Sequence, residues 1–592
     1  MALIRTKDTS TPLGISHASP TEYKQRKEVQ LQHAMPGIII FVHGVNSEGE
    51  WYQDAERHLL AGLNKRLGRE DLQSRSFDED NAKPDPDSSP TSPVIHFFWG
   101  YRAPDGQARK WKVPLRDNSK ERKSAWAKDY TPKPPLYWGG GAFQNGCNSL
   151  PLLWSERGFS RRVWAAFVPV DVQGMNPEVD RQLQDAPPRT YYAHAAGRLA
   201  DLVRKIRGKY PADTITLIGH SQGTQIVLGT VALLEPDNQP DCVMLMNGPY
   251  ALESKATDSL AQGNDAPTEK ARRNTFENIV RHFTKGYRQL TDDLIAKLRV
   301  GVTPDKEYWT PRLPGERDNT GRLYVYFNPH DRVMGSTALQ SIGWQGLPDS
   351  VLNKFPGTLY QRMLARTTPC GCEPGKAYLW PRDLDGKRSP FWNLMKKTKG
   401  MIRTDLWTTP DPNRQVTINA EAVPEPITAE EMVGFDTQSH EEERWELSRD
   451  YPFFRDIYDR EQWVKEDNPY ENRSTYRLET QEELEQRIAN YIPEPTDHST
   501  LPKHDHFLSR VVAYDLPIGF CQSHHDKAFW QELNRLADWR IGGSDAYFST
   551  GALSIPPMPA LIDTETYGDL QKQREQTAAL WNTHGKKETA LA

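Results

Sequence analysis

Five consecutive residues, Gly219-His220-Ser221-Gln222-Gly223, form a G-x-S-x-G sequence that could supply a nucleophilic serine. The preceding run 214–218 is β-branched and apolar like a buried parallel strand, and an apolar helix pattern follows. In such a nucleophile elbow the serine lies on a strained strand-to-helix turn, and glycines flank it because a Cβ there would collide with neighbouring backbone. The alternative is an ordinary glycine-rich turn with an incidental serine. The flanking elements favour acyl-transfer chemistry at Ser221.

A serine nucleophile needs a histidine base and a carboxylate that orients it. Asp331 follows the apolar run 323–327, so we predict a carboxylate beyond a late strand, where it can reach across the carboxyl edge of the sheet. Its alternative role is to cap a helix that starts after it. His498 lies in a loop before a predicted helix and completes the order Ser, Asp, His. A surface role is the alternative for every histidine here, and the less favoured candidates for the base are His504, His506, His524 and His525.

The apolar run 37–42 ends in His43-Gly44-Val45, which reads as a strand followed by a loop. In hydrolases of this type the main-chain N–H of a residue in that loop and that of the residue after the nucleophile form the oxyanion hole. We therefore predict Val45 and Gln222 as the two donors, with a plain turn as the alternative for the loop. No metal or cofactor is expected, because the only close cysteine pair, Cys370 and Cys372, has no second pair at ligand spacing.

The elements that must position these residues alternate along the chain. Strands are predicted at 37–42, 94–99, 214–218, 242–246 and 323–327, and helices at 54–67, at 190–210, after the elbow and at 268–283. The last helix could be a lid, but we favour a packing helix. The alternation predicts the α/β class: an α/β-hydrolase core with a mostly parallel sheet, and a large irregular or helical insertion between Asp331 and His498.

At 592 residues the chain is too long for one ordinary core. The predicted organisation is an N-terminal arm at 1–34, a first part of the core at 35–349 with lid-like excursions at 100–187 and 250–318, an inserted cap or partner unit at 350–490, completion of the core at 491–550 and a C-terminal tail at 551–592. We assign the tail no role.

Composition excludes several classes of function. There are 74 basic and 79 acidic residues and a formal charge of -5, so no nucleic-acid partner is expected. No stretch approaches the roughly 18 apolar residues that span a bilayer, and the N-terminus has no apolar signal region. We expect a chain without a transmembrane segment.

With these residues in view, the sequence resembles the α/β-hydrolase lipase effectors of bacterial type VI secretion, and within them the third antibacterial lipase-effector family. The resemblance is carried by Ile-Ile-Ile-Phe-Val-His-Gly-Val-Asn at 38–46, the elbow at 219–223, Asn-Pro-His-Asp at 328–331, and Asp-His-Ser at 497–499 followed by Ala-Tyr-Asp-Leu-Pro-Ile-Gly at 513–519. It covers most of the chain.

The resemblance implies a serine-dependent phospholipase that is made in the bacterial cytoplasm, secreted by a type VI route and active on membrane phospholipid in the periplasm of target cells. It also implies a secretion spike protein and a cognate immunity protein as partners. Two alternatives stay open from the residues alone: a non-lipid carboxylesterase with the same triad, and a catalytically silent binding or delivery protein on this fold.

Overall fold

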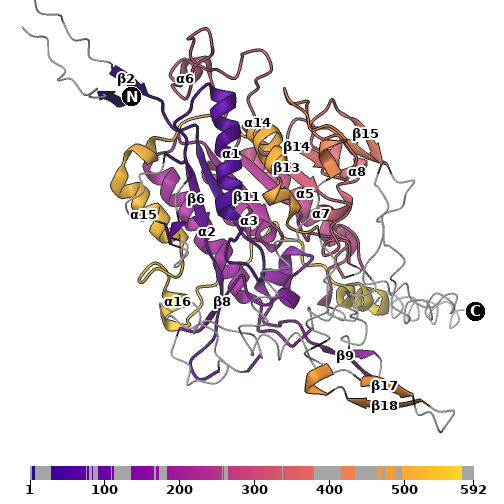
Figure 1. The fold of residues 1–592 in the computed structure, drawn as a ribbon. Coiled ribbons are helices and arrows are strands. Elements are labelled where there is room, and N and C mark those ends of the chain that lie inside the picture. Colours follow the sequence, from indigo (N-terminus) through magenta and orange to yellow (C-terminus); the bar gives the residue numbers. More distant parts are fainter. Residues whose placement is uncertain are drawn as a thin grey trace, which may run out of the picture.

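The computed structural model is built around a sheet of six strands in the order β14-β13-β12-β11-β3-β6, and every neighbouring pair is parallel (Figure 1). The strands are β3 (Ile38–Val42), β6 (Val94–Phe97), β11 (Ile215–His220), β12 (Cys242–Met246), β13 (Arg322–Phe327) and β14 (Leu359–Met363). Apart from β14, these strands have mostly apolar sequences that are buried, as expected for parallel strands covered on both faces. The predicted α/β class is confirmed.

The structure describes residues 3–6, 29–74, 77–78, 83–84, 91–107, 110–111, 135–165, 168–171, 183–255, 258, 265–336, 338–378, 415–433, 463–467, 474–478, 480–483, 486 and 497–576. Within these residues no helix has the length and apolar character needed to cross a bilayer.

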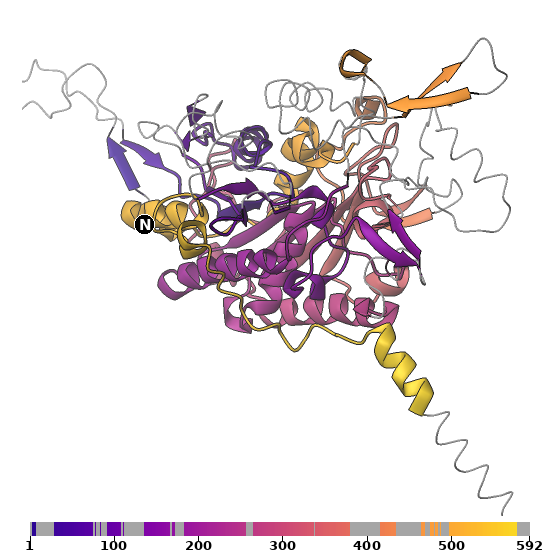
Figure 2. The same ribbon diagram turned by 90° about the horizontal axis from the view of Figure 1, so that it is seen from below.

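Helices cover both faces of the sheet (Figure 2). One layer holds α2 (Thr190–Lys209), α3 (Gln222–Leu233) and α5 (Glu269–Lys285). On the other face α1 (Tyr52–Leu67) packs against the π-helical turn Phe507–Val512 and α14 (Ala513–Asp515). α15 (Lys527–Ala537) packs beside the β6 edge. The strands and helices predicted between residues 37 and 327 are therefore present, and their apolar faces form one continuous core.

Strand β14 is an element that the sequence did not predict. It pairs with β13 from Leu323↔Leu359 to Phe327↔Met363, so the chain remains in the central sheet beyond residue 349, where the inserted unit was expected to begin. The side chain of Asn419 bonds the outer edge of β14, accepting from Gln361 N–H at 2.8 Å and donating to the Leu359 carbonyl at 2.8 Å. This amide blocks further strand pairing at that edge.

The segment 551–565 runs in an extended form along the outside of α2 and α5 (Figure 2). The Trp154 indole donates to the Pro556 carbonyl at 2.7 Å, the Asn278 amide donates to the Leu561 carbonyl at 3.0 Å, and Ile562 is buried. The first part of the predicted tail thus belongs to the folded body.

The remaining elements are short. Two-stranded antiparallel sheets pair β1 (Leu3–Thr6) with β2 (Val29–Gln32), β4 (Phe77–Asp78) with β5 (Lys83–Pro84), β7 (Gly100–Arg102) with β8 (Tyr137–Gly139), β9 (Arg162–Ala165) with β10 (Val168–Asp171), β15 (Gly375–Tyr378) with β16 (Gln415–Ile418) and β17 (Trp463–Asp467) with β18 (Ser474–Leu478). Short α-helices are α6 (Asp292–Ile295), α7 (Ile342–Gln345), α8 (Asp349–Leu352), α13 (Thr500–Lys503) and α16 (Ala546–Thr550). Short 3₁₀ turns are η2 (Phe143–Asn145), η3 (Leu150–Trp154), η5 (Pro236–Asn238), η7 (Glu431–Val433) and η9 (Gln522–His525).

Candidate active site

Ser221 lies between β11 and α3 with φ 54° and ψ −131°, a backbone conformation that L-residues rarely adopt. Its N–H donates to the Met246 carbonyl at 2.9 Å, which ties the turn to the end of β12. A Cβ on Gly219 would lie 2.8 Å from the Gly223 carbonyl oxygen, and one on Gly223 would overlap the Val42 carbonyl oxygen. Both positions therefore require glycine, and the strained turn has the geometry of a nucleophile elbow.

His498 connects Ser221 to Asp331 through its two ring nitrogens. Nε2 lies 2.7 Å from the Ser221 hydroxyl, and Nδ1 lies 2.7 Å from Oδ2 of Asp331. A carboxylate can only accept, so Nδ1 carries the hydrogen and Nε2 is available to accept from the serine. The structure thus brings together the three predicted side chains, although the serine and the histidine are 277 residues apart in the chain.

The Asp331 carboxylate is fully buried and is held by donors on both oxygens. Met334 N–H donates to Oδ1 at 2.9 Å, and the Asn247 amide donates to Oδ2 at 2.6 Å. With His498 as the third donor, the carboxylate has enough hydrogen bonds to keep a buried negative charge.

The loop that carries His498 is held at three points. His220 Nε2 donates to the His498 carbonyl at 2.9 Å, and the Asn328 amide donates to the Asp497 carbonyl at 3.1 Å. Arg366, just beyond β14, pairs with the buried Asp497 carboxylate at 2.8 Å. Asp497 itself has φ 52°, so these contacts hold the residue before His498 in a strained conformation.

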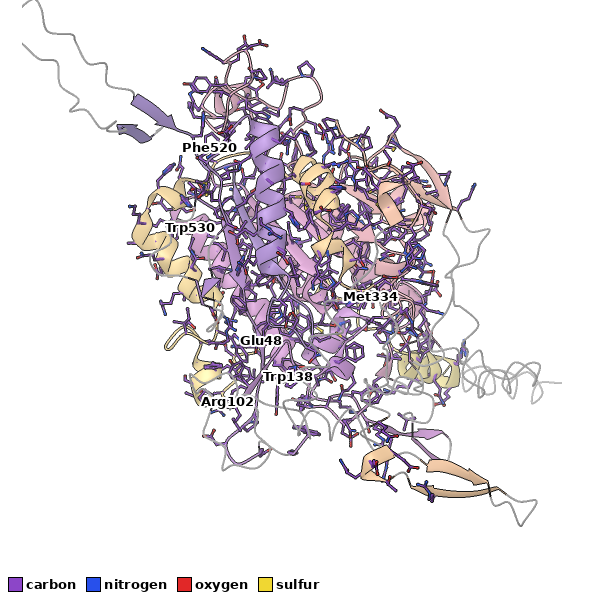
Figure 3. All side chains as sticks on the ribbon, in the orientation of Figure 1. Glu48, Arg102, Trp138, Met334, Phe520 and Trp530 are labelled. Atoms are coloured by element: carbon purple, nitrogen blue, oxygen red, sulfur yellow. The ribbon has the colours of Figure 1, made fainter. Side chains whose placement is uncertain are left out.

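The predicted oxyanion loop lies directly against the serine. A Cβ on Gly44 would come within 2.7 Å of the Ser221 Cβ, and one on Gly140 would come within 2.9 Å of the Val45 Cα. The loop is tied to β8 by Ser47 N–H, which donates to the Gly139 carbonyl at 3.2 Å. Figure 3 labels Glu48, from this loop, and Trp138, from β8.

Gln222 begins α3, where the first turn of N–H groups has no acceptor within the helix. Its side chain is held by the segment before η3, because Cys147 N–H donates to Oε1 at 3.0 Å and Nε2 donates to the Cys147 sulfur at 2.9 Å. The backbone N–H of Gln222 is thereby fixed beside the serine.

His43 fixes the other side of this region and is completely buried. Nδ1–H donates to the Gly44 carbonyl at 2.9 Å, Nε2 accepts from Trp99 N–H at 3.3 Å, and the imidazole stacks on the Trp99 ring. Burial lowers the pKa of His43 to about 4, so the ring is neutral at physiological pH and keeps Nε2 as an acceptor.

The less favoured histidines lie elsewhere. His504 Nδ1 accepts from Phe507 N–H at 3.2 Å, and His524 packs on Trp530 with ring centroids 4.9 Å apart. His506 lies 4.0 Å from Glu431. In the described part of the chain, no three His, Cys, Asp or Glu side chains gather in a way that could hold a metal ion.

Sequence reasoning assigned no role to the side chains that surround the three predicted residues: His220, Asn247, Asn328, Arg366 and Asp497. Asn247 follows directly on β12, the neighbour of the elbow strand, and Asn328 follows directly on β13, the strand that precedes Asp331. Their position at the carboxyl edge of the sheet was therefore a usable signal. Arg366 carried no such signal because β14 itself was not predicted.

A parallel sheet with a serine at a strained strand-to-helix turn defines the core as an α/β-hydrolase. A family model described as "T6SS Tle3 phospholipase effector domain" matches residues 35–348, and one described as "Antibacterial effector protein Tle3, C-terminal domain" matches residues 435–567. A curated relative, the antibacterial effector protein Tle3 of Pseudomonas aeruginosa, is 25% identical over 642 aligned residues, which cover 88% of this chain and 86% of the relative.

The chain therefore belongs to the Tle3 family of type VI secretion phospholipase effectors. It is an antibacterial, lipid-hydrolysing toxin that is secreted and acts in target cells. The expected phospholipase function is confirmed at this level.

Proposed function

We propose that the chain is a serine hydrolase of the phospholipase A type, which cleaves the carboxylic ester bonds of membrane phospholipids. The observation that carries this proposal is the continuous set of hydrogen bonds from Ser221 through His498 to Asp331. His498 takes the proton of Ser221 as the serine oxygen attacks the ester carbonyl, while Asp331 stabilises the imidazolium.

The oxyanion that forms is stabilised by the main-chain N–H groups of Val45 and Gln222, which are held by the contacts of Gly140 and Cys147. His498 then gives its proton to the departing lysophospholipid oxygen. Water attacks the acyl-serine with His498 again acting as base, and a free fatty acid leaves. The chain's own residues supply every proton transfer in this sequence.

The test is product analysis from vesicles of phosphatidylethanolamine and phosphatidylglycerol, incubated with wild type, Ser221→Ala, His498→Ala and Asp331→Asn. We expect fatty acid and lysophospholipid from the wild type, and rates lower by several orders of magnitude in the serine and histidine variants, of order 10⁶ by analogy with serine proteases. The matched control is His504→Ala. This variant should retain activity because His504 bonds the Phe507 backbone and not the serine. Diacylglycerol or phosphatidic acid as the main product would contradict A-type cleavage.

We further propose that the enzyme acts in the periplasm of the target cell, is carried by a secretion spike protein and is neutralised in the producer by a cognate immunity protein. The family's description as a type VI secretion effector supports delivery into another cell. Expression of the chain with and without a periplasmic leader in a recipient strain tests the compartment. Toxicity that depends on the leader and on Ser221 is expected, and equal toxicity without a leader would contradict it.

A further inference from the structure

Asn247 follows the last residue of β12, the strand that lies between β11 with its serine and β13 with its aspartate. Its side chain is fully buried and points into the gap between those two strand ends. The Nδ2 group lies 2.6 Å from Oδ2 of Asp331. The carboxylate can only accept, so the amide orientation is fixed with its nitrogen toward Asp331.

The same oxygen, Oδ2, also accepts from Nδ1 of His498 at 2.7 Å. Two donors from different elements therefore converge on one carboxylate oxygen, while Oδ1 is occupied by Met334 N–H. This arrangement prevents rotation of the carboxylate, and it divides the negative charge of Oδ2 between an amide and an imidazole.

Neither local feature of Asn247 favours stability. Its backbone has φ 49°, in the left-handed region, and its Oδ1 is buried with no hydrogen-bond partner among the described residues. A buried acceptor without a partner costs free energy. The left-handed conformation is less favourable for asparagine than for glycine. Both features are explained if the side chain is present for the hydrogen bond that it donates to Asp331.

We propose that Asn247 is a positioning residue for the hydrolysis assigned above: it fixes the Asp331 carboxylate toward His498 and limits how strongly that carboxylate stabilises the imidazolium. The inference rests on the proposed serine mechanism. Without the amide, Oδ2 keeps its full charge for His498, and the charged ring is favoured. The histidine is then a poorer base at low pH, because more of it is already protonated.

Several other groups face this pair and are unchanged by substitution at Asn247. His220 from the end of β11 bonds the His498 carbonyl, and Asp497 precedes His498 in its own loop. Arg366 beyond β14 neutralises Asp497. His330 and Arg332 flank Asp331 in the chain, and both are buried. A difference between wild type and an Asn247 variant is therefore caused by the change at position 247 and not by a change in these groups.

The experiment compares kcat/KM against pH for wild type, Asn247→Gly, Asn247→Asp and Lys306→Gly on a monomeric short-chain diacyl phosphatidylcholine. Glycine adopts a left-handed conformation without strain, so Asn247→Gly removes the amide but keeps the turn. Lys306 is exposed with φ 64°, which makes Lys306→Gly the control for the same backbone change away from the site. Thermal unfolding of each variant confirms folding.

For Asn247→Gly we expect kcat/KM to fall roughly tenfold, mainly in kcat, and the acid limb to move to higher pH. Asn247→Asp is isosteric but places a second carboxylate against Asp331, so its acid limb should move further in the same direction. Lys306→Gly should match the wild type in both rate and profile.

An acid limb that stays at the wild-type position in the folded Asn247→Gly and Asn247→Asp variants would overturn the proposal and leave Asn247 a packing residue. Should Asn247→Gly fail to fold, the isosteric Asn247→Asp profile decides the question alone. A Ser221→Ala variant measured in parallel separates failure of the serine mechanism from failure of the Asn247 proposal. If Ser221→Ala remains active, the serine mechanism fails, whatever the Asn247 profiles show.

Discussion

Gly140 and Gly44 touch backbone to backbone beside the serine. Gly140 has φ +66°, and a Cβ on it would overlap the Gly44 carbonyl oxygen and press on the Cα of Val45. Gly140→Ala should therefore displace the Val45 N–H from the serine. Loss of one oxyanion donor lowers kcat by about 10²-fold, so we expect a fall of that order with little change in KM. Steady-state kinetics on phospholipid vesicles measures both constants.

The control for this substitution is Gly106→Ala, because Gly106 has φ +73° and nothing lies within 4 Å of its added Cβ. It carries the same backbone strain without a collision. If Gly140→Ala keeps wild-type kcat, the loop after β3 does not supply an oxyanion donor, and the role proposed for Val45 must be abandoned.

His43 should make the fold sensitive to acid. Its pKa is lowered by burial to about 4 in the native state, whereas an unfolded histidine titrates near 6.5. The unfolded chain therefore binds a proton first as pH falls. The stabilisation is complete above pH 6.5 and is lost progressively down to pH 4, by about 3 kcal/mol in total.

Urea unfolding at several pH values tests this expectation, with His43→Gln as the comparison. Four other histidines with lowered pKa act in the same direction: His33, His58, His504 and His525. Between pH 6.5 and 4, the free energy of unfolding of the variant should therefore still fall with decreasing pH. Its slope should be smaller than that of the wild type by about 1.4 kcal/mol per pH unit. Identical slopes would mean that His43 is accessible to protons in the native state.

The sequence was most informative where one element determines both position and chemistry. The elbow needs an apolar strand, two glycines and a helix in fixed order, and Ser221 is placed as that pattern predicts. Asp331 was predicted because the carboxyl ends of parallel strands meet at one edge, and His498 was predicted from its loop before a late helix and from the order Ser, Asp, His. The structure brings both to the serine.

Long-range partners were not predictable in the same way. β14 has the sequence Leu-Tyr-Gln-Arg-Met, whose polar residues contact Asn419 and Asp515 from distant segments, so local hydrophobicity does not mark it as a core strand. Arg366 depends on β14 for its place beside Asp497. The left-handed conformations of Asn247 and Asp497 are likewise imposed by tertiary contacts.

Arg366 should affect turnover through the loop of the histidine. Its guanidinium pairs with Asp497, which is 2% exposed, at 2.8 Å, and Asp497 precedes His498. Arg366→Ala leaves a buried carboxylate without this cation, so we expect a roughly tenfold loss of kcat and a lower melting temperature. Arg366→Lys should recover part of the activity because it restores the charge without the fork of donors.

The matched control is Arg57→Ala, which removes an ion pair of 2.7 Å to Asp54 on the surface of α1. The side chains of this ion pair are both more than half exposed, so the stability and the turnover rate of the variant should be nearly unchanged. Equal effects of the Arg57 and Arg366 substitutions on kcat would show that the contact with Asp497 does not hold the histidine loop.

Cysteine reactivity reports whether the segment before η3 stays on the elbow in solution. Cys147 bonds Gln222 through both its backbone and its sulfur, and burial raises the pKa of its thiol to about 11. Because the thiolate is the reactive form, iodoacetamide at pH 8 should label the exposed Cys372 long before Cys147. Peptide mass spectrometry over time measures both rates, and unfolding in urea should equalise them. Labelling of Cys147 as fast as Cys372 in the native protein, with loss of activity in step, would mean that this segment opens and leaves Gln222 unsupported.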